Sequence, residues 1–221
     1  APLVPAFHQH LFGQPGQGLL VLNIGGIANL SVLGADGSVL GFDCGPGNMI
    51  IDAVVSIITN GRKQYDRNGT IARQGQVSDA LLKKCLRHPF FRLRPPKTTG
   101  REAFGLDYSR QFYQSGLALG LKPADIVATA TALTAQSIAD SYRRFLPAVP
   151  QEVILCGGGA NNPTLKTMLA QRLPESRLMT TNDFGISSDA KEAISFAILA
   201  WAAVKGLANN VPSATGAARP A

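Results

Sequence analysis

The stretch that decides the fold is residues 19–30, LLVLNIGGIANL, in which an apolar run ends at two glycines. A second stretch of the same design is residues 153–162, VILCGGGANN. Glycine allows close approach of a ligand to the backbone, and backbone N–H groups at such turns favour phosphate oxygens. One such turn also suits a plain hairpin. Two glycine-rich turns, each of which follows a buried-strand pattern, predict a nucleotide held between two subdomains.

The segments around these turns alternate between strand and helix patterns, which is typical of the α/β class. Strands are expected over residues 19–23, 29–33, 39–42, 152–155 and 177–180, the first three as a meander. Helices are expected over residues 49–59, from Ser78 through Leu86, near Asp107–Phe112, over residues 123–145 and 164–173, and from Ser188 to about Gly206. Residues 43–48 read as a tight loop in which Asn48 caps the next helix, and residues 60–75 and 90–106 read as irregular. We expect one domain over residues 1–208 and a flexible tail over residues 209–221.

Bulk properties exclude several classes of protein. The 221 residues are 45% apolar, enough for a real core. No apolar run is long enough to span a membrane, and no signal peptide is visible. The three cysteines, Cys44, Cys85 and Cys156, are far apart, so we expect buried free thiols in a reducing cytoplasm rather than a metal site or disulfides.

The formal charge of +7 raises the question of nucleic acid. The densest basic stretch holds Arg87, Arg92, Arg94, Lys97 and Arg101, and two prolines interrupt it. A nucleic-acid footprint would be a basic stripe on one element with regular aromatic residues. The stretch therefore favours a solvated loop or a site for a small anion, and no nucleic-acid partner is expected.

Three segments carry candidate substrate-binding side chains. Asp43 orients a substrate or a hydrated Mg²⁺ in one interpretation and only forms a turn in the other. Lys97 and Arg101, within KTTGRE, suit an oxyanion, although a plain surface loop explains them equally well. Glu192 lies on the last expected helix and is either partly buried and paired or an ordinary surface glutamate.

These motifs, taken in order, resemble a known family. They are APLVPAFH at residues 1–8, NIGGIAN at 23–29, GFDCGPGN at 41–48, YDRNG at 65–69, KTTGRE at 97–102, CGGGAN at 156–161 and DAKEA at 189–193. The series resembles the 1,6-anhydro-N-acetylmuramic acid kinases of bacterial cell-wall recycling. The resemblance implies a ribonuclease-H-like domain of the actin-like ATPase and sugar kinase superfamily, with a mixed sheet and flanking helices.

The resemblance also implies roles for single residues. Gly25 and Gly26, with Asn29, would form the second phosphate loop, and Gly157, Gly158, Gly159 and Asn161 the adenosine-side loop. Asp43, Lys97, Arg101 and Glu192 would bind the anhydro-amino-sugar or phosphate, with Asp43 also toward Mg²⁺. Family members open the 1,6-anhydro bridge with water and move the γ-phosphate of ATP to O6. An exposed helix face and the resemblance together favour a homodimer.

The chain departs from the family at its beginning. Family members carry an N-terminal half with the first phosphate loop and a catalytic aspartate before the segment that matches residues 1–3. The chain is therefore expected to be the C-terminal portion, with the general base upstream of Ala1 and no activity alone. The alternative is a nucleotide-binding actin-like module without catalysis, which would show no sugar-dependent rise in ATP consumption.

Overall fold

The computed structural model contains one mixed five-stranded sheet. It describes residues 19–34, 36, 38–146, 151–185, 191–208, 210, 212 and 218–219. The strands are β1 (Leu19–Ile24), β2 (Ile27–Leu33), β3 (Val39–Pro46), β4 (Glu152–Cys156) and β5 (Arg177–Thr180), in the spatial order β3-β2-β1-β4-β5. The strands β1, β2 and β3 form an antiparallel meander, whereas β4 pairs parallel to β1 and β5 parallel to β4. The predicted α/β class and meander are confirmed, and a strand is present at each predicted segment, with longer bounds in β2 and β3.

Strand β3 corrects one prediction. Residues 43–46 were expected to form a loop, but β3 continues to Pro46 and only Gly47 and Asn48 turn the chain. The strand continues because it is paired on both sides. Asp43 lies opposite Asn29 of β2, and its backbone N–H donates to the carbonyl of Lys97 at 3.0 Å. Asp43 is thus a strand residue and not a turn residue.

Most helices lie close to their predicted positions. The helices are α2 (Met49–Ile58), α3 (Asp79–Cys85), α4 (Arg101–Phe104), α5 (Leu106–Ala118), α6 (Pro123–Phe145), α7 (Pro163–Arg172) and α8 (Lys191–Val204). Helix α4 is the exception, because it lies within residues 90–106, which were expected to be irregular. Short 3-10 turns occupy η1 (Arg67–Gly69), η2 (Ala72–Gln74), η3 (Pro89–Arg92), η4 (Gly158–Asn161) and η5 (Thr181–Phe184), several of them in segments predicted to be irregular. The predicted cap Ser78 accepts the N–H of Leu81 at 3.4 Å. Ser188 and most of the predicted tail lie outside the described residues.

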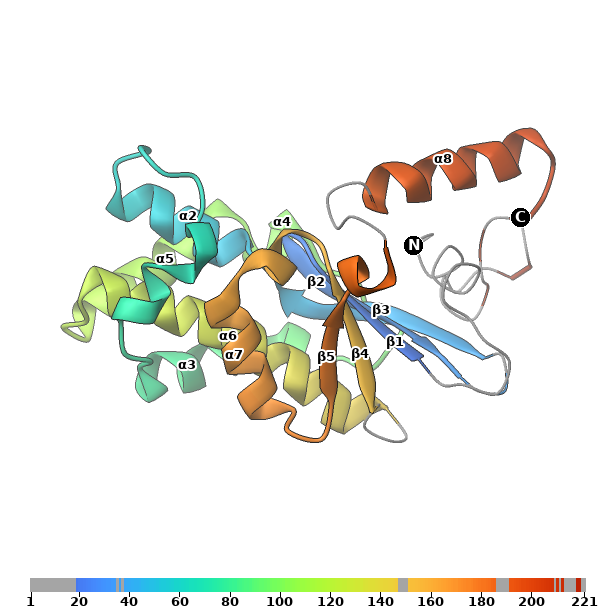
Figure 1. Ribbon diagram of the computed structural model, residues 1–221. Helices are drawn as coiled ribbons and strands as arrows, with labels where there is room; N and C mark the ends of the chain where they lie inside the picture. Colours follow the sequence, from blue (N-terminus) through green and yellow to red (C-terminus); the bar gives the residue numbers. More distant parts are fainter. Residues whose placement is uncertain are drawn as a thin grey trace.

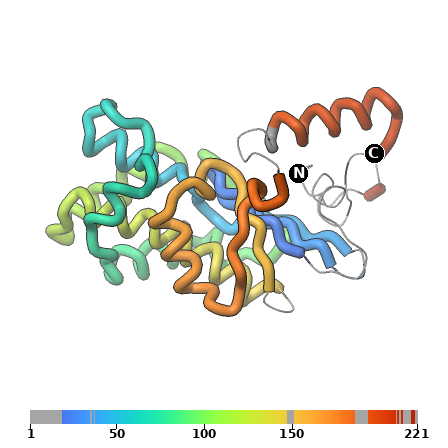
Figure 2. The backbone as a smooth tube through the Cα atoms, viewed as in Figure 1, coloured from blue at the N-terminus to red at the C-terminus, as the bar shows by residue number. Residues whose placement is uncertain are grey.

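Helix α6 joins two parts of the core. Its C-terminal half packs, together with α7, on one face of the sheet, where Leu22, Phe42 and Tyr142 are fully or nearly fully buried. Its N-terminal half packs into a second cluster with α2, α3, η3, α4 and α5. Figure 1 shows these helices gathered beyond one end of the sheet, and Figure 2 shows the same division along the backbone. The candidate site lies where the two parts meet, at the start of α2.

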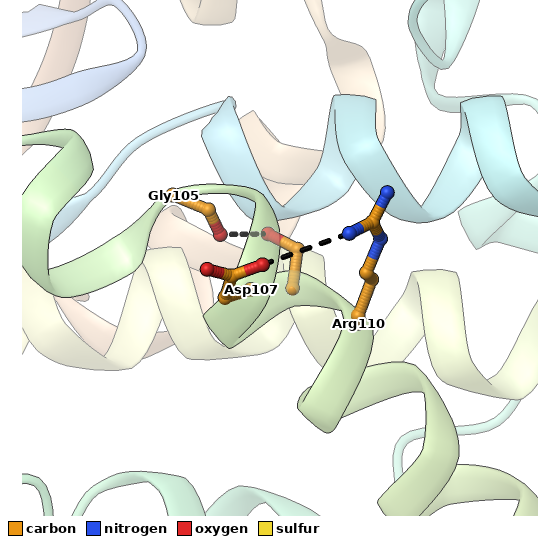
Figure 3. Close-up of polar contacts among 4 residues, drawn as sticks. Gly105, Asp107 and Arg110 are labelled. Carbon is orange, nitrogen blue, oxygen red and sulfur yellow. Dashed lines mark hydrogen bonds and ion pairs between the residues drawn. The ribbon is translucent and has the colours of Figure 1, made fainter.

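Helix α5 carries an ion pair at its start (Figure 3). Arg110 lies 3.6 Å from Asp107, three residues earlier, and both side chains are well exposed. Surface pairs of this kind contribute little to stability. A substitution at Arg110 is therefore expected to change stability little.

The remaining features concern the length of the helices, the state of the cysteines and the grouping of possible metal ligands. None of the helices in the described ranges has the length and apolar character needed to cross a membrane. Cys44, Cys85 and Cys156 are free and buried, as predicted. Within the same ranges, no group of three or more His, Cys, Asp and Glu side chains could hold a metal ion.

Candidate nucleotide and substrate site

The two glycine turns lie side by side because β1 and β4 are parallel neighbours, with Asn23 opposite Cys156. Gly157 has a φ of +77°, and a Cβ on it would lie 2.8 Å from the carbonyl oxygen of Ile24. A Cβ on Gly159 would overlap the side chain of Ile24. The packing of η4 against β1 therefore explains two of the three consecutive glycines without any ligand.

Gly158 has no such explanation. It is exposed and its φ is ordinary, and a Cβ there would meet only Asn48 Nδ2, at 3.7 Å. Packing does not require glycine at this position. The space that a side chain would enter belongs to the pocket that Gly158 and Asn48 both line.

The first glycine turn is held by the start of α2. The N–H groups of Gly47 and Asn48 donate to the carbonyls of Gly26 and Gly25, at 2.9 and 2.7 Å. Asn48, the predicted cap, uses its side-chain amide instead to donate to the carbonyl of Ile24 at 3.3 Å. Gly26 is exposed, and in the described part of the chain its N–H has no backbone acceptor. It is therefore free to donate to a phosphate oxygen.

A polar pocket of about 380 Å³ lies between α2, the loop before η1, and η4. Its lining residues are Asn48, Ile51, Asp52, Tyr65, Asp66, Asn68, Gly158, Asn161 and Asn162. Gly158 and Asn161 were predicted to bind nucleotide, and the pocket brings them together. Most of the lining groups donate or accept hydrogen bonds, and Tyr65, which is 56% exposed, provides an aromatic surface.

Asp52 is the residue of this pocket that sequence reasoning missed. Burial, together with the nearby carboxylate of Asp66, raises its pKa to about 6. Its side chain forms no hydrogen bond or ion pair with the described residues. The signal was present, because Asp52 interrupts the otherwise apolar run of residues 50–55. A half-buried carboxylate without a partner that faces a pocket is a candidate ligand-binding group.

Asp66 has a different role in the same pocket. Its side chain is 5% exposed and accepts the backbone N–H groups of Ile71 and Ala72, each at 2.9 Å. It therefore orders the segment between η1 and η2 and so fixes one wall of the pocket.

Asp43 and Asn29 lie away from this pocket. The pairing register places Asp43, Asn29 and Asn23 in one row across β3, β2 and β1. Asp43 accepts the backbone N–H of Thr99 at 2.8 Å, and burial raises the pKa of its carboxyl. The row presents a carboxylate and two amides on the sheet face opposite the one that packs on α6. The roles predicted for Asp43 and Asn29 stay predictions.

Lys97 lies on the other side of β3 from the Asp43 carboxylate. It is 5% exposed, and its ammonium is 4.4 Å from the ring centroid of Phe90 and 5.0 Å from that of Phe145. Cation–π contacts of this kind stabilise a buried ammonium. The aromatic contacts of the Lys97 ammonium suit a role in anchoring the loop, while its charge still interacts with the Asp43 carboxylate. The substrate contact expected of Lys97 stays a prediction.

The other two predicted substrate residues are less defined. Arg101 is exposed as the first residue of α4, two positions after Thr99, so it is on the same loop as the Asp43 contact. The side chain of Glu192 lies outside the described part of the chain. Both assignments stay predictions.

A solved structure supports the fold. The activator of the 2-hydroxyisocaproyl-CoA dehydratase from Clostridium difficile, solved with bound ADPNP, matches 80% of this chain and 57% of its own, with a TM-score of 0.50 and 16% identity. At this identity the match bears on the fold alone. With the strand order above, it supports the predicted α/β fold with a mixed sheet and flanking helices, and the placement among the actin-like ATPases stays a prediction.

Curated relatives match over nearly the whole chain. Anhydro-N-acetylmuramic acid kinases from Caldanaerobacter subterraneus and Cyanothece sp. are 44% and 46% identical over 100% and 99% of it. The chain spans 57% and 60% of their lengths, and the expectation that it is their C-terminal portion stays a prediction. The family model described as anhydro-N-acetylmuramic acid kinase matches residues 1–221. The chain therefore belongs to the anhydro-N-acetylmuramic acid kinase family.

Proposed function

We propose that this chain binds the nucleotide of an ATP-dependent kinase that acts on 1,6-anhydro-N-acetylmuramic acid. The observation that carries the proposal is Gly158, an exposed glycine over a polar pocket at a position where packing requires no glycine. The relatives named above as kinases of this sugar support the reaction. The ADPNP bound to the C. difficile activator supports the nucleotide.

The two glycine turns would hold different parts of ATP. The free N–H of Gly26 suits a phosphate oxygen, and the exposed backbone at Gly158 allows the nucleoside to approach closely. The Asp52 carboxylate would accept hydrogen bonds from the nucleoside hydroxyls, and Asn161 provides an amide beside them. Tyr65 provides an aromatic face for the base.

The sugar and the metal would lie at the row that contains Asp43. Mg²⁺ usually keeps several waters and binds through one or two carboxylates and the phosphates of its substrate. Asp43 fits this demand, because only one hydrogen bond, from Thr99, is made to its half-buried carboxylate in the described residues. Mg²⁺ would neutralise charge on the transferring phosphoryl group. Arg101 and Glu192 are proposed on the sugar side.

The reaction balances with water as a reactant. Water adds to C1 of the sugar, the C1–O6 bond breaks, and O6 accepts the γ-phosphoryl group of ATP to leave ADP. A general base must remove a proton from the water. We assign that base to a part of the longer protein outside this chain, so the chain alone is proposed to be inactive. The family membership does not favour the alternative of a non-catalytic module.

Two further expectations belong to the proposal. Phe196 and Trp201 on α8 are 56% and 57% exposed, and an apolar surface of this kind supports the expected homodimer. The buried free thiols suit a reducing cytoplasm.

The test is a phosphate-transfer assay on a protein of the relatives' length that contains this chain. We expect ³¹P NMR to show a sugar 6-phosphate formed from ATP only when 1,6-anhydro-N-acetylmuramic acid is present. The Gly158→Val variant should lose most of this activity, and the matched control Ala118→Val, at an exposed position of α5, should keep it. No sugar-dependent turnover in the folded wild-type protein would contradict the proposal.

A further inference from the structure

The basic stretch of residues 87–101 does not act as one unit. Arg87 lines a hollow beside α3 and α5, Lys97 is buried among aromatic rings, and Arg101 begins α4. Arg92 and Arg94 remain, and the fold brings them to Arg144 at the end of α6. Three arginines from two segments far apart in sequence therefore line one hollow.

The hollow is an open depression of about 670 Å³ that three arginines and three apolar residues line. The lining residues are Leu40, Arg92, Arg94, Pro95, Arg144 and Phe145. The volume lies within the range of small-molecule sites, roughly 300–1,000 Å³. The Arg144 guanidinium is held in place, because it donates to the carbonyl of Phe91 at 2.8 Å and lies 5.3 Å from the Phe145 ring centroid.

Within the described residues, no ion pair compensates the charge of the three arginines around this hollow. The ion pairs within the described ranges join Arg110 to Asp107 and Arg177 to Glu152, so none involves the three arginines. A fourth cation, the buried ammonium of Lys97, lies 5.0 Å from the Phe145 ring centroid. Burial lowers the pKa of Lys97 and the Arg144 charge lowers it further, whereas Cys44 and Asp43 act in the opposite direction. Bringing an anion into this field would relieve the repulsion.

The hollow is separate from the candidate nucleotide pocket. Leu40 lies near the beginning of β3, whereas the nucleotide pocket begins just beyond its end, at Asn48. The six residue-to-residue steps from Leu40 to Pro46 span about 20 Å in an extended strand. One small ligand therefore does not occupy both places.

From this arrangement we infer that the hollow between Arg92, Arg94 and Arg144 is a second binding site, for a small phosphomonoester with an apolar or planar body. Guanidinium groups bind phosphate oxygens through paired hydrogen bonds, and the apolar lining residues Leu40, Pro95 and Phe145 would contact the apolar body. The site does not depend on the proposed function, because it shares no residue with the nucleotide pocket.

Isothermal titration of the 221-residue chain with phenyl phosphate tests the inference. We expect saturable binding that weakens at least tenfold in the double variant Arg92→Gln/Arg94→Gln and changes less than twofold in Arg110→Gln. Both arginines are exposed, so the double variant should fold, and its circular dichroism and melting temperature check this. Phenol, which has the ring without the phosphate, should bind at least tenfold more weakly than phenyl phosphate.

Two additional arms separate the alternatives. Phenyl phosphate affinity should be unchanged in Gly158→Val, which places binding outside the nucleotide pocket whether or not that pocket holds ATP. A twelve-nucleotide oligothymidylate should bind no more tightly than phenyl phosphate. The inference is overturned if phenyl phosphate does not bind, or if it binds the wild type and the double variant equally. It is also overturned if phenol binds as tightly as phenyl phosphate, or if Gly158→Val weakens phenyl phosphate binding. Much tighter binding of the oligonucleotide than of phenyl phosphate would overturn it as well.

Discussion

Replacing Asp52 by asparagine should stabilise the protein in a pH-dependent way. Burial and Asp66 raise the pKa of Asp52 from 3.8 to about 6, so the folded state disfavours its ionised form. A shift of this size corresponds to about 3 kcal/mol, and partial exposure of the side chain reduces this to ~1–2 kcal/mol. The loss of stability from ionising Asp52 in the folded state is absent below about pH 4, grows as the pH rises toward about 6, and is complete above that pH.

The Asp52→Asn variant removes this cost. Its free energy of unfolding should therefore exceed that of the wild type by ~1–2 kcal/mol at pH 8, and the gain should vanish near pH 4. Urea denaturation at pH 4, 5, 6, 7 and 8 measures the difference. A matched control is Glu175→Gln at an exposed turn, which should stay within about 0.5 kcal/mol of the wild type throughout.

The same variant tests the proposed role of the carboxylate. Adenosine, which carries no phosphate, should bind several-fold more weakly to Asp52→Asn, because an amide accepts hydrogen bonds less strongly than a carboxylate. A stability gain of equal size at pH 4 and pH 8, or a loss at pH 8, would refute the reasoning about burial. Unchanged adenosine affinity would refute the contact with the ligand.

Three further variants follow from packing. Tyr142→Phe should raise the free energy of unfolding by about 1 kcal/mol and the melting temperature by ~2–4 °C, because the buried hydroxyl has no hydrogen-bond partner among the described residues; a lower melting temperature would contradict this. Gly159→Ala should lower the free energy of unfolding by ~1–3 kcal/mol, because the new Cβ would overlap Ile24, whereas Gly158→Ala should change it by less than about 0.5 kcal/mol. Equal changes for the two variants in urea denaturation would contradict the claim that packing requires glycine only at position 159. Asp66→Ala should cost ~2–3 kcal/mol, since two backbone N–H groups lose a charged acceptor, and a neutral effect in urea would exclude that role.

The hydrophobic periodicity of the sequence predicted most of the regular elements. It failed where pairing with a distant segment decided whether residues form a strand or a loop. The run from Pro123 to Phe145 has a helical period throughout, and α6 has these bounds. Residues 43–46 read as a loop because they contain glycine and proline. They form a strand because β2 and the backbone at Lys97 pair with them, and long-range pairing leaves no local signal.

The glycine turns were identified correctly as a pair, but the sequence could not divide their roles. The packing of η4 on β1 explains Gly157 and Gly159, and only the three-dimensional arrangement shows that Gly158 has no packing partner. Asp52 could have been found as a charge within an apolar helix. The aromatic rings around Lys97 could not have been predicted from the sequence, because Phe42, Phe90 and Phe145 come from separate segments.

The most direct measurement of the central claim is the affinity of the 221-residue chain for ADP, determined by calorimetry for the wild type, Gly158→Val and Ala118→Val. A valine at position 158 would project toward Asn48 and fill part of the pocket, so the dissociation constant should rise at least tenfold, about 1.4 kcal/mol. The Ala118→Val control should bind ADP like the wild type. Undiminished ADP binding by a folded Gly158→Val protein would contradict the claim that this pocket holds the nucleotide.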